Sequence, residues 1–183
     1  MQPEDSARRA ELLDKIVAYA RRHGLADVSL RPLAAAVGSS PRVLLYFFGS
    51  KEKLVREVVA YTRAEQVATL APELNAAAVD RLWAWLSDND NVTRLFYESY
   101  ALSLRDDPGP WAGFGAASVR EWLPHLLPLS ARLLPGVPAE TGATLILAML
   151  RGLLMDRLAT GDTERVDAAV ALFENLLTAE PPA

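Results

Sequence analysis

Hydrophobic residues recur at three- and four-residue spacing along most of the chain. In residues 6–23 the stripe is formed by Leu12, Ile16, Val17 and Ala20, and such a period predicts a helix with one buried face. No segment alternates polar and apolar residues as a half-buried strand does. The pattern therefore predicts an all-α protein of about nine helices.

Glycines, prolines and capping residues divide this pattern into separate elements. Gly24, Gly38 and Gly49 are expected to end helices, because glycine adopts the left-handed conformation without steric cost. Pro124 and Pro128 are expected to kink or break the helix that contains them. The expected helices cover residues 6–23, 30–37, 41–48, 51–70, 76–87, 91–105, 111 to about 124 or 134, 139–159 and 163–178.

Residues 29–53 predict two very short helices, a tight turn between them, and the start of a third helix. Ser29, Ser40 and Ser50 are expected to cap these helices by accepting hydrogen bonds from backbone N–H groups of the first turn. Pro41 occupies a first-turn position, where its missing N–H costs nothing. Two short helices joined in this way form a helix-turn-helix, whose second helix usually enters the DNA major groove.

The run GSSPRVLLYFFGSKEKL at residues 38–54 resembles the DNA-binding signature of the tetracycline-repressor (TetR) family of bacterial transcriptional regulators. The shared features are a glycine-serine turn, a short helix ending in aromatic residues, and Gly-Ser-Lys before a long helix. Residues 7–37 resemble the first two helices of that family. The resemblance implies a three-helix DNA-binding domain at residues 1–53 and an effector-binding and dimerisation domain at residues 54–183.

Charge is distributed unevenly between these two parts. The net charge is −4, but residues 1–53 hold nine Lys or Arg and six Asp or Glu, whereas residues 54–183 hold ten and seventeen. DNA affinity depends on local neutralisation of phosphates and not on total charge. A basic N-terminal part on an acidic remainder therefore fits a DNA-binding protein.

The amino-acid composition excludes several classes of protein. The chain has no cysteine, which excludes disulfides and thiolate chemistry. The N-terminus has no apolar signal core, and the longest apolar run is too short to span a bilayer. We expect a cytoplasmic protein with no membrane contact, no cofactor and no bound metal.

The second short helix supplies the expected DNA contacts. Arg42 can hold guanine through O6 and N7, and Ser29 and Tyr46 can reach phosphates through their hydroxyl groups. Lys51 stands at a helix N-terminus, where the helix dipole also favours an anion. The resemblance supports the roles of Ser29, Tyr46 and Lys51. The expected DNA-binding set is Ser29, Ser39, Ser40, Pro41, Arg42, Leu45, Tyr46 and Lys51.

Two positions depart from the family pattern. Leu45 stands where many members have tyrosine, and Phe47 stands where a polar or basic ring is common. Phe47 cannot donate a hydrogen bond to phosphate, so we expect no contact from it. Core packing is the alternative for Tyr46 and the expectation for Phe48, and Val43 and Leu44 are expected to face inward.

Aromatic residues are concentrated between residues 83 and 122. Side chains of this type usually pack in a core, but the resemblance implies an effector cavity that is lined mainly by apolar groups. It therefore implies a small, largely apolar or aromatic effector. The expected effector-binding set is Trp83, Phe96, Tyr97, Tyr100, Trp111, Phe114, Trp122, His125 and Met149.

The last two helices are expected to pair with a second copy of the chain. Residues 139–159 are apolar on most sides, which is more than one buried face requires. Two such helices from each subunit would form a four-helix bundle across a twofold axis. The alternative is that they close the core of the monomer. The expected interface is Leu145, Met149, Gly152, Leu153, Val166, Val170, Phe173 and Leu177.

These expectations together favour a dimeric, ligand-responsive transcriptional repressor that binds a pseudo-palindromic operator. Activation in place of repression, and a DNA-binding adaptor without a ligand, are the alternatives. An all-helical enzyme is a third reading, but the chain has no glycine-rich phosphate loop and no GxSxG motif. His125 near Trp122 is the one candidate catalytic position, and we expect no enzyme activity.

Overall fold

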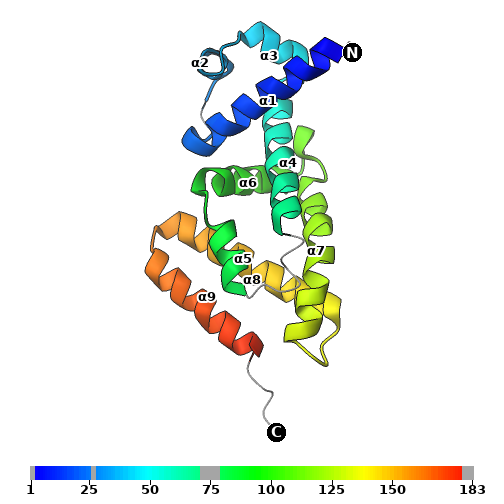
Figure 1. The fold of residues 1–183 in the computed structure, drawn as a ribbon, viewed down its shortest axis with the longest axis vertical. Helices are drawn as coiled ribbons and strands as arrows, with labels where there is room; N and C mark the ends of the chain where they lie inside the picture. Colours follow the sequence, from blue (N-terminus) through cyan, green and yellow to red (C-terminus); the bar gives the residue numbers. More distant parts are fainter. Residues whose placement is uncertain (1–2, 26–27, 71–78, 179–183) are drawn as a thin grey trace. The chain divides into compact units, whose positions relative to one another are not determined.

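The computed structural model describes residues 3–25, 28–70 and 79–178. Over these residues it contains helices and no strand (Figure 1), which confirms the all-α class. The elements are α1 Pro3–His23, α2 Leu30–Ala36, α3 Pro41–Phe48, α4 Lys51–Leu70, α5 Val79–Leu86, α6 Asp90–Ser103, a 3-10 turn η1 Gly109–Trp111, α7 Phe114–Leu133, α8 Ala139–Thr160 and α9 Thr163–Thr178.

The chain divides into two compact units. The first contains Met1–Glu65 and Asn91–Phe114, and the second contains Gln66–Asp90 and Gly115–Ala183. Helix α6 therefore packs with the N-terminal helices although it follows α5 in the sequence. The expected functional division after residue 53 stays a prediction, since compactness alone does not say which residues bind DNA or effector.

The first unit is built around one hydrophobic core. Buried residues of α1, α2, α3 and α4 meet there with Leu95 of α6 and with Trp111 and Phe114. Ile16, Leu33 and Leu44 are among the side chains that are fully buried. Each helix here is amphipathic, so this shared core is what holds the short helices in place.

Polar contacts between α1 and α4 follow one face of α4. Arg9 pairs with Glu57, and Arg21 pairs with Glu65 at 2.6 Å. Between these pairs, Tyr61 donates to Asp14, and this hydrogen bond is the main reason that the Tyr61 pKa is raised. Glu57, Tyr61 and Glu65 are spaced by four residues, which places them on one side of the helix.

Helix α6 is joined to the C-terminal end of α1. The Asn91 side-chain amide donates to the Arg21 backbone carbonyl at 3.1 Å, which satisfies one of the carbonyls that a helix end leaves open. Gly24 then ends α1 with a φ of +72°. The sequence pattern of α6 gave no indication of this contact.

The second unit is built around α5, α8 and α9. Helix α9 packs against both α8 and α5 (Figure 1). Its buried stripe is Val166, Val170, Phe173 and Leu177. At the α5–α9 contact, the buried Trp83 donates its indole N–H to Asp167 at 2.7 Å, and Glu174 accepts from the Val79 N–H at 3.0 Å.

The prolines of α7 were expected to kink or break the helix, and the break is wrong. The helix runs from Phe114 to Leu133 with Pro124 and Pro128 inside it, and it begins after a separate 3-10 turn and not at Trp111. Both prolines are exposed, whereas Leu126 and Leu129 are buried on the opposite side. The carbonyls that lose a helical partner therefore lie where solvent can hydrogen-bond them.

The other helix bounds agree with expectation within a few residues. Helix α6 is shorter than expected at its C-terminal end, stopping at Ser103. The expected start of the fifth helix, at residues 76–78, lies outside the described residues.

A close approach between α7 and α8 depends on Gly142. A Cβ at this position would lie 2.2 Å from Ser130 Oγ and 2.9 Å from a Leu134 methyl carbon. Gly142 and Ser130 are both buried. By contrast, a Cβ at Gly152 on the same helix would meet nothing within 4 Å.

Gly142→Ala is expected to lower the free energy of unfolding by about 1–3 kcal/mol, because the added methyl group overpacks a buried contact. Gly152→Ala is the matched control and should raise that free energy by about 0.5–1 kcal/mol, since alanine favours helix more than glycine does. Urea unfolding followed by circular dichroism gives both values. Equal stability of the two variants would contradict the close α7–α8 contact.

Candidate nucleic-acid interface

The helix-turn-helix is formed by α2, α3 and the turn between them. Gly38 lies in this turn with a φ of +68°, a conformation that favours glycine. The Ser40 hydroxyl accepts from the Val43 N–H at 3.3 Å, and the Ser50 hydroxyl accepts from the Lys53 N–H at 3.2 Å. The expected caps at Ser40 and Ser50 are therefore confirmed.

The expected cap at Ser29 is wrong. Ser29 occupies the N-cap position of α2 with an extended backbone, but its side chain makes no capping hydrogen bond. The side chain is exposed. Its hydroxyl group is therefore not committed to the helix end, which is compatible with a contact to phosphate.

Helix α3 separates its residues into an inner and an outer face. Leu44 and Phe48 are buried, as expected, and Val43 and Phe47 pack partly against the same core. The outer face is formed by Arg42, Leu45 and Tyr46, of which Leu45 is 42% and Tyr46 is 71% exposed. The alternative that Tyr46 packs in the core is therefore wrong.

Arg9 anchors the C-terminal end of α3, and sequence reasoning missed this residue. Its Nε donates to the Phe47 backbone carbonyl at 3.3 Å, and its guanidinium group lies 5.1 Å from the centre of the Phe48 ring. It also pairs with Glu57 of α4. In the sequence Arg9 is one of two adjacent arginines off the hydrophobic stripe, and nothing in the pattern distinguishes it from Arg8.

The Ser39 side chain does not fit the expected contact with DNA. Its hydroxyl oxygen is buried and has no hydrogen-bond partner among the described residues, and its backbone N–H donates to the Ala34 carbonyl at 2.8 Å. Both groups are therefore turned into the domain. Of the next two residues, Ser40 is exposed and Pro41 is half-buried.

The start of α4 carries charges of both signs. Lys51 is half-buried and Lys53 is exposed. The Glu52 pKa is lowered, first by a hydrogen bond from its own backbone N–H and then by one from the Ser50 hydroxyl. Glu52 therefore places a negative charge at the N-terminus of α4. The sequence analysis expected the helix dipole at this position to favour a DNA phosphate.

The expected effector residues fall into both units. In the first unit five of them form a group: Phe96 lies 5.3 to 5.9 Å, between ring centres, from Tyr97, Tyr100 and Phe114. Trp111 lies perpendicular to Phe114 at 5.5 Å. Trp83, Trp122, His125 and Met149 belong to the second unit.

A buried arginine contacts the aromatic group of the first unit. Arg63 of α4 is buried, and its guanidinium group lies 5.0 Å from the centre of the Phe114 ring. A cation over an aromatic face at this distance is attracted by the ring electrons. Sequence reasoning missed Arg63, because a single arginine within an amphipathic helix is usually solvated.

Two hollows open in the first unit. One, of about 160 Å³, is lined by Trp111 together with residues of α4 and α6 and by Leu25. A neighbouring hollow of about 180 Å³ is lined by residues from the end of α1 and the first half of α6, including His23, Asn91 and Arg94. Leu25, Leu95 and Glu98 line both.

The structure contradicts half of the residues that were expected to form the dimer interface. Val166, Val170, Phe173 and Leu177 are buried within the protomer, because α9 uses this stripe to pack on α8 and α5. On α8, Leu145, Met149 and Gly152 are exposed and Leu153 is half-buried.

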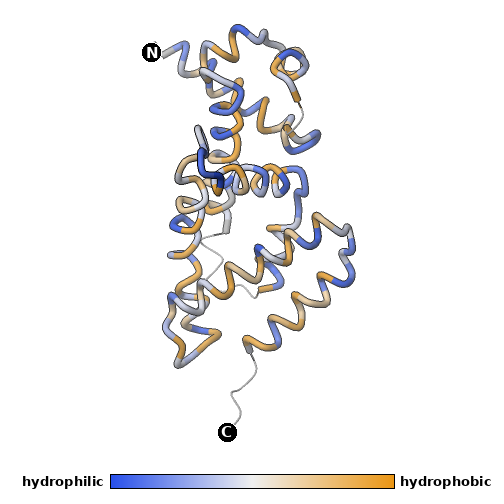
Figure 2. The backbone as a smooth tube through the Cα atoms, turned by 180° about the vertical axis from the view of Figure 1, so that it is seen from behind, coloured by the Kyte–Doolittle hydropathy of each residue, from blue (hydrophilic) through white to orange (hydrophobic). Residues whose placement is uncertain are grey.

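The exposed side of α9, opposite the buried stripe, carries two leucines that the expected interface did not include. Leu172 is 59% and Leu176 is 66% exposed, and Figure 2 shows hydrophobic residues on successive turns of this helix. The sequence signal was present, since Leu172 and Leu176 are also four residues apart, but periodicity alone did not tell the two apolar stripes apart.

Comparisons with known proteins agree with this geometry. Residues 12–58 match the family described as bacterial regulatory proteins, tetR family. The chain is 29% identical over 103 residues to the HTH-type transcriptional regulator BetI of Brucella melitensis biotype 2, which is 53% of this chain and 50% of that protein. The chain thus spans about half the length of the curated relatives that it matches.

Solved structures share the fold over nearly the whole chain. A transcriptional regulator from Rhodococcus sp. Rha1 superposes with a TM-score of 0.68 at 19% identity, covering 94% of this chain and 99% of that one. NalD, the secondary repressor of the MexAB-OprM multidrug efflux pump in Pseudomonas aeruginosa, gives a TM-score of 0.57 at 16% identity, covering 95% of each chain.

The fold and the N-terminal site define a helix-turn-helix protein with additional helices. Residues 12–58, from within α1 to within α4, match the tetR family of bacterial regulatory proteins, so the expected resemblance of the N-terminal part is confirmed. Over the described residues, no helix has the length and apolar character needed to cross a bilayer.

Arg9→Met is expected to lower the free energy of unfolding by about 1–2 kcal/mol, because it removes a hydrogen bond to a carbonyl, an ion pair and a ring contact together. Arg8→Met, at an exposed neighbouring position, should change it by less than about 0.5 kcal/mol. Chemical unfolding of both variants measures the difference. If Arg8→Met proves as costly as Arg9→Met, Arg9 does not anchor α3.

Proposed function

We propose that this protein is a ligand-responsive transcriptional repressor that binds a pseudo-palindromic DNA operator as a homodimer. The observation that carries the proposal is the outer face of α3, where Arg42, Leu45 and Tyr46 are exposed while Leu44 and Phe48 fix the helix from below. A helix held in this way can enter the major groove without rearranging. Such a protein acts where the chromosome is, in the cytoplasm.

Arg42 is proposed to read a base, and the surrounding polar groups are proposed to contact phosphates. Arginine forms paired hydrogen bonds with O6 and N7 of guanine, a geometry that no other base pair offers in the major groove. Ser29, Tyr46 and Lys51 carry hydroxyl or ammonium groups suited to phosphate, which contributes affinity without sequence preference. Ser40, Pro41 and Leu45 complete the proposed contact surface.

The homodimer is proposed to form through the exposed apolar residues of α8 and α9. These are Leu145, Met149, Gly152, Leu172 and Leu176, with the half-buried Leu153 at their edge. Pairing of two helices from each subunit would cover these side chains in a four-helix arrangement. Two DNA-binding domains related by a twofold axis would then match two half-sites about one helical turn apart.

The effector is proposed to be small and largely apolar or aromatic. The aromatic group of Phe96, Tyr97, Tyr100, Trp111 and Phe114 in the first unit supports this. For Trp83, Trp122, His125 and Met149, which belong to the second unit, effector binding stays a prediction from the sequence. NalD, which shares the fold, is named as a repressor. An effector with higher affinity for a DNA-free form would shift the dimer away from the operator.

Arg42→Ala is expected to weaken binding to the preferred sequence by about 1–3 kcal/mol and to remove the preference at one base position in each half-site. Lys51→Ala should weaken binding to all sequences and lower the slope of log affinity against log salt by about one. Fluorescence anisotropy with matched and mismatched duplexes measures both effects.

Arg120→Ala, at an exposed position of α7 in the second unit, is the control and should leave DNA affinity unchanged. The groove assignment is wrong if Arg42→Ala retains the full preference at every base position.

Leu172→Glu combined with Leu176→Glu is expected to convert the dimer to a monomer at micromolar concentration, because burying two carboxylates in an apolar interface is costly. Leu104→Glu, at an equally exposed leucine of the first unit, should leave the mass in solution unchanged. Sedimentation equilibrium distinguishes the two. A monomeric parent protein, or a dimeric double variant, would exclude this interface.

A further inference from the structure

We propose that Leu45 of α3 reads the C5-methyl group of a thymine in the DNA major groove, at the base pair next to the guanine assigned to Arg42. This inference rests on the function proposed above, in which the outer face of α3 enters the groove. It adds a second base-reading residue to Arg42 and names the base that this residue recognises.

An apolar side chain is exposed on the outer face of α3. Leu45 is 42% exposed, although the residue before it, Leu44, is fully buried. A single exposed leucine is common on protein surfaces, so exposure alone assigns no role to it. Leu45 is distinguished by its place on the short helix that also exposes Arg42 and Tyr46.

Helical spacing makes Leu45 a neighbour of Arg42. Residues three positions apart are adjacent on a helix surface, and they are separated by about 4.5 Å along the helix axis. Successive base pairs of B-DNA are about 3.4 Å apart, and residues with this spacing read successive bases in zinc fingers. Leu45 and Arg42 therefore suit adjacent base pairs when α3 lies in the groove.

The remaining outer residue, Tyr46, lies on the other side of Arg42. With 3.6 residues per turn, the positions three and four residues after Arg42 fall on opposite sides of it. The Tyr46 ring is edge-on to the Phe47 ring, with 5.0 Å between the ring centres. Arg42 is therefore flanked by an apolar side chain on one side and by a hydroxyl-bearing ring on the other.

The chemistry of the leucine side chain favours thymine. This side chain has no hydrogen-bond donor or acceptor, so it cannot replace the water that the amino and carbonyl groups of a base lose on contact. Among the four bases, thymine presents an apolar group in the major groove, its C5-methyl. Contact between this methyl group and Leu45 removes apolar surface of both partners from water, which is favourable.

The backbone of Leu45 is fixed before DNA binds. Its carbonyl accepts a hydrogen bond from the Gly49 N–H at 2.9 Å, and Leu44 and Phe48 hold the opposite side of the helix in the core. Contact with DNA then orders one side chain and no backbone. A fixed helix is needed to distinguish one methyl group, because a mobile helix could adjust to either base.

The test uses the full-length protein and the duplex that it enriches from random DNA. Each thymine of one half-site is replaced in turn by deoxyuridine, which keeps the base pairing and lacks only the C5-methyl group. Fluorescence anisotropy is expected to show one position where the replacement weakens binding about threefold to fourfold, the effect of removing one methyl group from an apolar contact. This base pair should adjoin the one at which Arg42→Ala removes the preference.

Variants at Leu45 assign the effect to its side chain. Leu45→Ala is expected to bind the thymine and deoxyuridine duplexes equally, whereas Leu45→Met should keep the difference, because methionine is apolar and of similar length. Alanine and methionine both favour helix, so α3 is retained in both variants. Leu104→Ala, at an exposed leucine outside α3, is the matched control and should keep the full difference.

A second comparison moves the methyl group to another base. A C·G pair replaces the T·A pair at the sensitive position, with either cytosine or 5-methylcytosine in the thymine strand. The parent protein is expected to bind the methylated duplex about threefold to fourfold more tightly, and Leu45→Ala should bind the two equally. This result would separate recognition of the methyl group from the other differences between the two base pairs.

The proposal is overturned if the half-site contains no thymine, if it tolerates deoxyuridine at every thymine, or if Leu45→Ala keeps the full difference. A sensitive thymine away from the base pair of Arg42 would overturn the assignment of the two residues to adjacent base pairs. If no duplex is enriched, the function proposed above fails together with this inference. A sequence-specific complex that does not distinguish thymine from deoxyuridine contradicts the inference alone.

Discussion

Helix α3 is eight residues long, and the proposed function depends on holding it in one position. Isolated helices shorter than about 12–15 residues are marginal in water, so α3 owes its existence to what it packs against. The buried side of the helix is narrow, with Leu44 and Phe48 one turn apart. Every residue that enters the core is lost to the outer surface, which is why few side chains are left to meet DNA.

The supports of α3 come from helices on either side of it in the sequence. Arg9 of α1 binds the Phe47 carbonyl near the end of α3 and pairs with Glu57 of α4. The α1–α4 contacts at Tyr61 and Glu65 extend this link along α4. Helix α6 joins the same unit through Asn91 and Leu95. Helices α1, α3, α4 and α6 are therefore connected by contacts within one compact unit.

Local signals in the sequence predicted the helices and the turn well. The caps at Ser40 and Ser50, the glycines at 38 and 49, and the burial of Leu44 and Phe48 all depend on short-range spacing. Errors arose where the outcome depends on tertiary packing. The prolines of α7 were expected to kink or break their helix, but the helix continues through both. The buried stripe of α9 was assigned to a dimer, because periodicity shows that a face is apolar but not what covers it.

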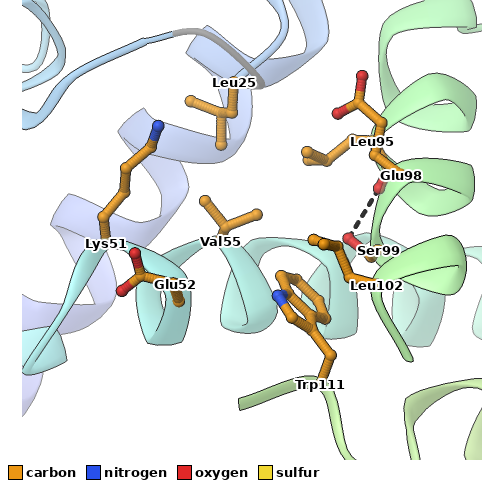
Figure 3. Close-up of a pocket in the computed structure, with 9 residues that line it drawn as sticks. All are labelled: Leu25, Lys51, Glu52, Val55, Leu95, Glu98, Ser99, Leu102 and Trp111. Atoms are coloured by element: carbon orange, nitrogen blue, oxygen red, sulfur yellow. Dashed lines mark hydrogen bonds between the residues drawn. The ribbon is translucent and has the colours of Figure 1, made fainter. Parts of the chain in front are cut away.

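The candidate DNA-binding site also combines features that short-range spacing predicts with features that depend on tertiary packing. The exposed position of Arg42 was expected from its spacing relative to Leu44, whereas the exposure of Tyr46, the buried hydroxyl of Ser39 and the anchoring role of Arg9 required coordinates. The hollow beside Lys51 (Figure 3) combines Leu25, which follows α1, with residues of α4, α6 and the 3-10 turn before α7. No linear pattern connects these positions, so sequence reasoning could not find it.

The proposed operator binding is tested by enrichment of random duplex DNA with the purified protein, followed by sequencing. A dimeric repressor should enrich a motif with twofold symmetry, whose half-sites are contacted by two copies of α3. An absence of enrichment by a folded dimer at low salt would contradict it, and so would a motif without twofold symmetry.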